Sequence, residues 1–203
     1  VRQANPVAER GPAIADQVGE LTVFQRRPNW SAPLNNGPIT DAEMADIRSR
    51  YDEIFAACSR SPGGFEHEPD RRGFWKVTRE ERVALWDELY GKPGFAIWLR
   101  NFREIFFDEE ANAEFSEFIA EKIRERVNDP AVAEKLIPTD HGFGMRRPPM
   151  ETGYYEAFNR PSCTLVDLHE TPIERITETG IVTAAGEEEV DRIGCAPGFD
   201  AAT

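Results

Sequence analysis

The chain has 203 residues, of which 24 are Lys or Arg and 37 are Asp or Glu, so its formal net charge is -13. This acidic balance argues against general nucleic-acid binding, and no apolar run approaches the roughly 20 residues that cross a bilayer. With 40% hydrophobic and 30% charged residues, the composition suits one globular domain, or one domain with a large insertion, and excludes a disordered chain.

The cysteines and histidines do not suggest cross-links or metal binding. The three cysteines are widely spaced and form no CxxC motif: Cys58, Cys163 and Cys195. The three histidines lack the spacing of metal ligands. We therefore expect no disulfide framework, no metal site and a reducing, cytoplasmic location. The first residues hold neither an initiator Met nor the apolar segment of a signal peptide, which fits a processed or partial chain.

Residues 1–28 are predicted to form a helix followed by a strand. The stretch "PAIADQVG" has the pattern of a helix end, with Gly19 as its stop. The β-branched and aromatic residues of "ELTVFQ" predict a strand directly after it. Helix, glycine and strand in this order are typical of an α/β unit.

Residues 29–140 are predicted to be helical. The helices are expected over 41–60, 79–91, 94–107, 108–127 and a short stretch that Asp129 and Pro130 open. Thr40 can cap the first of them, and Thr78 followed by Glu81 forms a capping box for the second. The Trp and Phe side chains lie mostly on apolar helix faces, which favours core packing; Trp30, at a boundary, could instead line a cleft.

The remaining residues, 141–203, are predicted to return to strands. Three short β-rich stretches, "CTLVDL", "IERIT" and "GIVTA", are separated by turn residues. Two acidic runs are candidates for metal ligation, but simpler interpretations are available. The run 108–110 suits the first turn of a helix, and the run 187–189 suits a solvated turn.

Two arginine pairs are the candidate functional residues. Arg26 and Arg27 follow the predicted strand "ELTVFQ", and ligands of open α/β sheets bind outside the carboxyl ends of strands. In a dinucleotide-binding unit, arginine at this place suits a 2′-phosphate, so the pair favours NADP over NAD if a dinucleotide binds. The other interpretation is an exposed pair near a turn.

The second pair, Arg146 and Arg147, lies in the Gly/Pro-rich stretch "GFGMRRPP". Adjacent cations repel, and loops on rigid scaffolds often carry function. If residues 141–203 return to the sheet in which the first strand lies, the two pairs are expected to converge on one anion.

Four stretches together resemble the Baeyer–Villiger monooxygenases, which are NADPH- and FAD-dependent flavoproteins. They are "GELTVFQRRPNW", "RVNDPAVAEKLIPTDHGFGMRRPPMETGYYEAFNR", "LVDLHETPIERITETGI" and "PGFDA". The resemblance runs from about residue 13 to the end of the chain and is greatest to the phenylacetone, steroid and cyclododecanone monooxygenase group.

The resemblance implies an α/β fold in which a partial Rossmann-like NADP-binding domain is interrupted by a large all-helical insertion. Residues 1–28 and 144–203 correspond to the two incomplete parts of the NADP domain, and 29–143 to the insertion. The missing FAD domain of the parent protein is the expected partner. The chain is therefore expected to be an internal fragment that binds no FAD and is inactive alone.

The resemblance also implies a reaction and roles for the arginines. One oxygen atom of O2 is inserted into a ketone, through a C4a-peroxyflavin, to give an ester or lactone. Arg26 and Arg27 correspond to residues that contact the 2′-phosphate side of NADP, although the family usually has Thr where Arg27 stands. Arg146 stands where Lys is common and should keep the phosphate contact. Arg147, as the catalytic residue, corresponds to the arginine that contacts NADP and steadies the anionic peroxyflavin, because a fixed cation stabilises an oxyanion.

The sequence departs from the family in several places. It contains no GxGxxG, which in the family lets the backbone approach the pyrophosphate, and no FxGxxxHxxxW signature. Pro197 in "CAPGFD" stands where the family usually has Thr. These departures support an alternative, which is a non-catalytic relic or a helical module that binds a partner without a cofactor.

Overall fold

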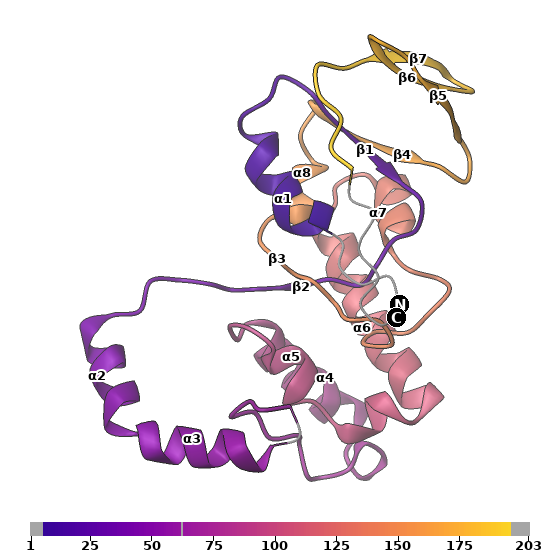
Figure 1. Ribbon diagram of the computed structural model, residues 1–203. Coiled ribbons are helices and arrows are strands. Elements are labelled where there is room, and N and C mark those ends of the chain that lie inside the picture. The colour runs from indigo at the N-terminus through magenta and orange to yellow at the C-terminus, as the bar shows by residue number, and fades with distance from the viewer. Residues whose placement is uncertain (1–5, 62, 196–203) are drawn as a thin grey trace, which may run out of the picture. The chain divides into compact units, whose positions relative to one another are not determined.

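The computed structural model describes residues 6–61 and 63–195 and is a mixed α/β structure (Figure 1). Pro197 and most of the segment where the glycine fingerprint was expected lie outside these described residues. The chain divides into two compact units, the first made of Val1–Ala32 and Ser116–Thr203, the second of Pro33–Phe115. The predicted domain bounds, 1–28, 29–143 and 144–203, and the assignment of a Rossmann-like domain and an insertion stay predictions.

The first unit is built around short strands and the helices that cover them. Its elements are α1 (Pro6–Ala15), β1 (Leu21–Gln25), the second part of α6 (Glu109–Arg126), α7 (Pro130–Leu136), β3 (Met150–Glu151), α8 (Tyr154–Ala157), β4 (Cys163–Asp167), β5 (Ile173–Ile176), β6 (Gly180–Thr183) and β7 (Gly186–Glu189). The predicted strands at β1, β4, β5 and β6 are confirmed. The first helix ends at Ala15, so the predicted stop at Gly19 lies beyond it.

A parallel pair of strands joins the two ends of the first unit. β1 pairs with β4 in a register that sets Leu21 opposite Cys163 and Gln25 opposite Asp167 (Figure 1). The chain therefore returns in its last third to the strand that Arg26 follows, which meets the condition on which convergence of the arginine pairs was predicted. The side chain of Gln25 is buried and donates from Nε2 to the Lys135 carbonyl of α7, at 2.7 Å.

The strands β5, β6 and β7 form a separate antiparallel sheet, with β6 in the middle. The acidic run 187–189 lies in β7, so the predicted solvated turn is wrong. Its residues pair with Gly180, Ile181 and Val182 of the buried strand β6. The Thr177 and Thr179 hydroxyls donate to Glu187, and these bonds lower the pKa of its carboxyl. Strand pairing thus outweighs the poor β-propensity of glutamate.

The second unit contains α2 (Asp41–Ser49), α3 (Tyr51–Arg60), the 3-10 turn η1 (Phe74–Lys76), α4 (Arg79–Tyr90), α5 (Ala96–Leu99) and the 3-10 turn η2 (Arg103–Phe106). The cap predicted at Thr40 and the capping box predicted at Thr78 are confirmed, and Thr40 also forms a capping box, with Glu43 at the third helical position. Trp86 and Phe74 are fully buried in its core. The core packing predicted for the Trp and Phe side chains has exceptions among the described residues, which are Phe55 (64% exposed), Phe65 (43%), Trp75 (53%) and Phe107 (84%).

The continuous helix predicted over 41–60 is wrong, because the chain breaks at Arg50, which has φ -111° and ψ 13°. Just before the break, the Ser49 hydroxyl donates to the Asp46 carbonyl at 2.7 Å, and Arg50 pairs with the Asp46 carboxylate at 2.8 Å. The Ser49 hydroxyl, which bonds to a backbone carbonyl of the preceding turn, competes with the helical hydrogen bonds.

The continuous helix predicted over 94–107 is also wrong, and the cause is the buried side chain of Asn101. Its Oδ1 accepts from the Phe102 N–H at 2.8 Å and from the Trp86 indole at 2.9 Å. Its Nδ2 donates to the Ile97 carbonyl at 3.1 Å. The amide thus ends the helix and also accepts the indole N–H of Trp86 from α4. Helical periodicity in the sequence does not reveal such a tertiary interaction.

Gly180 provides a test of the antiparallel sheet. A Cβ atom at this position would overlap the backbone carbonyl oxygen of Glu188. We expect Gly180→Ala to lower the free energy of unfolding by about 1–3 kcal/mol, because a backbone atom of the paired strand must move. Gly19→Ala is the matched control, since nothing lies within 4 Å of its added methyl group. Equal midpoints for the two variants in urea unfolding would contradict the described pairing.

Candidate functional site

The candidate site lies in the first unit, where β1 ends. Arg26 and Arg27 directly follow Gln25, the last residue of the strand, and both are exposed. Pro28 fixes the backbone as the chain leaves the strand. The next residue but one, Trp30, is 3% exposed, and its indole donates to the His141 carbonyl at 2.8 Å. The segment after β1 is therefore fixed against the loop that carries the second arginine pair.

The loop 142–149 is itself anchored at several points. Phe143 is buried against Trp30, with ring centroids 6.4 Å apart, and its N–H donates to the Ser116 hydroxyl at 2.9 Å. Gly144 has φ 80°, a conformation that favours glycine and turns the chain before the arginines. The Pro149 carbonyl accepts from the N–H of Ala32 at 3.2 Å. These contacts fix the Gly/Pro-rich loop that carries Arg146 and Arg147.

One arginine of each pair faces the carboxylate of Asp140. Arg146 Nη2 lies 3.1 Å from Asp140 Oδ2, and Arg27 Nη1 lies 3.7 Å from the same oxygen. One arginine of each pair, Arg27 and Arg146, therefore approaches the same carboxylate of the protein, and convergence of both pairs on one anionic ligand stays a prediction. The hydrogen bond from His141, with smaller contributions from the charges of His141 and Arg146, lowers the pKa of Asp140.

A second set of contacts leads from Asp140 to Arg147. Nδ1 of His141 lies 2.6 Å from Asp140 Oδ1, and its Nε2 lies 3.1 Å from Asn29 Oδ1. The Nδ2 group of Asn29 donates to the backbone carbonyl of Arg147 at 3.2 Å. The Arg147 backbone is therefore held by the segment that follows β1, while its side chain is exposed.

Sequence reasoning identified the arginines but missed the three residues that connect them: Asn29, Asp140 and His141. The available signal was position, because Asp140 and His141 stand immediately before "GFGMRR" and Asn29 immediately after "RRP". Neither residue type nor spacing distinguishes them from other polar residues of the chain.

The arrangement is suited to a phosphate group. Each guanidinium is ionised and carries five N–H donors. Asp140 faces the donors of only one nitrogen of Arg27 and of one nitrogen of Arg146. The remaining donors can bind phosphate oxygens, for which the guanidinium fork has matching geometry. Arg26 and Arg147 add two exposed side chains next to this pair. The residues present thus fit the phosphate of a nucleotide cofactor.

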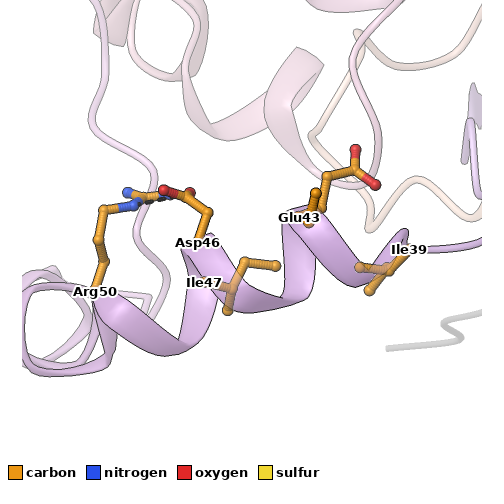
Figure 2. Close-up of a pocket in the computed structure, with 6 residues that line it drawn as sticks. Ile39, Glu43, Asp46, Ile47 and Arg50 are labelled. Carbon is orange, nitrogen blue, oxygen red and sulfur yellow. Dashed lines mark hydrogen bonds and ion pairs between the residues drawn. The ribbon is translucent and has the colours of Figure 1, made fainter.

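The described cavities lie elsewhere and do not involve the candidate arginines. In the second unit, a cavity on α2 is lined by Ile39, Ala42, Glu43, Asp46, Ile47 and Arg50 (Figure 2). In the first unit, a cavity of about 360 Å³ adjoins Phe24 of β1, Val166 of β4 and Glu188 of β7. The candidate site is formed instead by the end of β1 and the loop 142–149.

Two further properties concern the described part of the chain. Within residues 6–61 and 63–195, no group of three or more His, Cys, Asp or Glu side chains is placed to hold a metal ion. None of the helices that the structure describes combines the length and apolar character needed to cross a membrane.

The chain is similar in sequence to several monooxygenases. No family model matches it. It is 46% identical over 192 residues to the 2-oxo-Delta(3)-4,5,5-trimethylcyclopentenylacetyl-CoA monooxygenase of Pseudomonas putida, covering 95% of this chain and 35% of that protein. It is 40% identical over 199 residues to the cyclopentanone 1,2-monooxygenase of Comamonas sp. (strain NCIMB 9872), covering 97% of this chain and 36% of that protein.

A structural relative is an oxidised steroid monooxygenase bound to NADP, with a TM-score of 0.94 and 40% sequence identity. The match covers 98% of this chain and 38% of that chain. The chain therefore spans about a third of the length of the relatives it matches.

The lowered pKa of Asp140 predicts how its contribution to stability depends on pH. A carboxyl whose pKa is lower in the folded state stabilises the fold above its unfolded value, about 4, and loses this effect as pH falls through the folded value. Since the side chain is 40% exposed, we expect Asp140→Asn to cost at most about 1 kcal/mol at pH 7.

This difference between the wild type and Asp140→Asn should shrink as the pH falls below about 4. Urea unfolding of both proteins at several pH values between 7 and 3 measures it. A difference of the same size at both ends of this range would show that the ion pairs of Asp140 do not stabilise the fold.

Proposed function

Because the chain belongs to the Baeyer–Villiger monooxygenase family over the third of those proteins that it spans, we propose that it carries the NADP-binding arginines of an NADPH- and FAD-dependent ketone monooxygenase. The observation that carries this proposal is the meeting of Arg27 and Arg146 at one carboxylate beyond the end of β1. Asp140 offsets part of the repulsion between these guanidiniums, and their remaining donors and positive charge favour an anionic ligand in an otherwise acidic chain.

The arginines have separate roles in this proposal. Arg26 and Arg146 bind the 2′-phosphate that distinguishes NADPH from NADH, with Arg27 beside them. Arg147 provides a fixed cation next to the nicotinamide end and stabilises negative charge that develops during the reaction. When bound in the whole protein, FAD and NADPH supply the oxygen and hydride chemistry, and the protein supplies binding, orientation and charge.

The proposal extends to the partners and place of the whole protein. Its substrates are O2 and a small ketone, which is converted to an ester or lactone, and its partner in the parent chain is an FAD domain. A partial Rossmann-like domain formed by 1–28 and 144–203, interrupted by the helices of 29–143, holds the NADP, and the protein works in the cytoplasm.

Nucleotide preference tests the proposed function. We expect the chain to bind NADPH more tightly than NADH, and Arg26→Ala with Arg146→Ala to reduce this preference about tenfold or more, since charge-assisted bonds to phosphate are lost. Titration calorimetry with both nucleotides measures the preference. Arg48→Ala with Arg60→Ala, which removes two exposed arginines of the second unit, is the matched control.

If neither nucleotide binds, the alternative of a helical module that binds a partner without a cofactor gains support. Equal binding of NADPH and NADH would contradict a 2′-phosphate site and would leave the arginine pairs without a role in nucleotide selection.

The FAD site is proposed to lie outside this chain. We therefore expect the purified chain to show no visible flavin absorbance after incubation with FAD and removal of unbound cofactor, because no described residue is assigned to FAD. A retained flavin spectrum would contradict this and would require that the chain form a flavin site of its own. The parent protein, treated identically, is the positive control.

A further inference from the structure

Asp140 is the residue on which the candidate anion site converges. Its Oδ2 atom faces Arg27 from the segment after β1 and Arg146 from the loop 142–149, at 3.7 and 3.1 Å. These segments are far apart in the sequence, and their guanidiniums carry like charges that repel. A carboxylate between them converts the repulsion into two attractions.

The other oxygen of Asp140 acts on the third arginine. Oδ1 faces Nδ1 of His141, whose Nε2 faces Asn29 Oδ1, and the Asn29 amide holds the Arg147 carbonyl. Since the Nδ2 group of Asn29 donates to that carbonyl, its Oδ1 can only accept from His141.

We propose that Asp140 is the positioning residue of the anion site, holding Arg27 and Arg146 with one oxygen and, through His141 and Asn29, the backbone of Arg147 with the other. This inference rests on the proposed function, because the ligand proposed for the arginines is the 2′-phosphate of NADPH. The carboxylate does not block that ligand. It faces one nitrogen of each guanidinium and leaves the other donors of Arg27 and Arg146 available.

The energetic reason is preorganisation. A free arginine side chain loses much rotamer freedom when it binds a phosphate, and a carboxylate that already holds it reduces this loss. The site stays cationic, because the Arg27 and Arg146 side chains exceed the single negative charge of Asp140, and Arg26 and Arg147 lie next to them. Asp140 thus orders the donors while the site keeps its attraction for an anion.

The test is the nucleotide preference of Asp140→Asn, which keeps the shape of the side chain and removes its charge. We expect its affinity for NADPH to fall about tenfold and its affinity for NADH to change less than about twofold, because only NADPH carries the 2′-phosphate that the positioned arginines would bind. A merely structural role would weaken both alike. Asp140→Glu, which keeps the charge, should recover part of the preference.

The matched control is Asp46→Asn, which removes a carboxylate paired with Arg50 in the second unit and should leave the preference unchanged. If Asp140→Asn keeps or increases the preference of the wild type, the positioning role is overturned while the proposed function stands. If the wild type itself does not distinguish NADPH from NADH, the proposed function fails and this inference fails with it.

A measurement without nucleotide applies even if Asp140→Asn folds poorly. Phenylglyoxal modifies accessible guanidiniums, and peptide mass spectrometry gives the rate at each arginine. In the wild type we expect Arg27 and Arg146 to react more slowly than Arg26, for which the described structure gives no ion pair. In Asp140→Asn the rates at Arg27 and Arg146 should approach that of Arg26. Equal rates at all three in the wild type would show that Asp140 does not hold them.

Discussion

The parallel pairing of β1 with β4 is the constraint on which the first unit depends. It brings a strand from the start of the chain next to one from its last third, in register from Leu21 and Cys163 to Gln25 and Asp167. The connection between the strands contains the whole second unit. The entropic cost of closing a loop rises only slowly with its length, so a long connection with its own core is compatible with this pairing.

The same pairing gives the arginines their setting. Gln25 is the last residue of β1, and its buried side chain donates a hydrogen bond to α7. Arg26 and Arg27 therefore directly follow the end of the strand. Phe143, which precedes the second arginine pair, packs against Trp30 and thereby holds the loop next to the segment that follows β1. The positions of the charged groups therefore follow from apolar packing and backbone hydrogen bonds, and only the last step, the meeting at Asp140, is electrostatic.

The features that could be predicted from the sequence are those fixed by near neighbours. The capping boxes at Thr40 and Thr78 need only a glutamate three residues on, and the strand at Leu21–Gln25 shows its β-branched and aromatic residues directly. The failures depend on distant partners. The amide of Asn101 ends a helix while bonding to Trp86, and the glutamates of β7 are strand residues because β6 lies beside them.

For the same reason, the arginines of the candidate site could be predicted from the sequence, whereas Asp140 could not. Adjacent arginines stand out in an acidic chain, whereas Asp140 is one of 37 acidic residues and gains its role only when the segment after β1 returns to it. Its presence also gives a physical account of Arg27, the second of two adjacent arginines.

A second guanidinium directly after Arg26 would add repulsion at the strand end unless a negative charge lay within reach. Asp140 supplies that charge at 3.7 Å. Arg26 and Arg27 therefore differ in environment although they are neighbours in sequence. Arg27 faces a carboxylate of the protein, whereas the described residues include no ion-pair partner for the exposed Arg26.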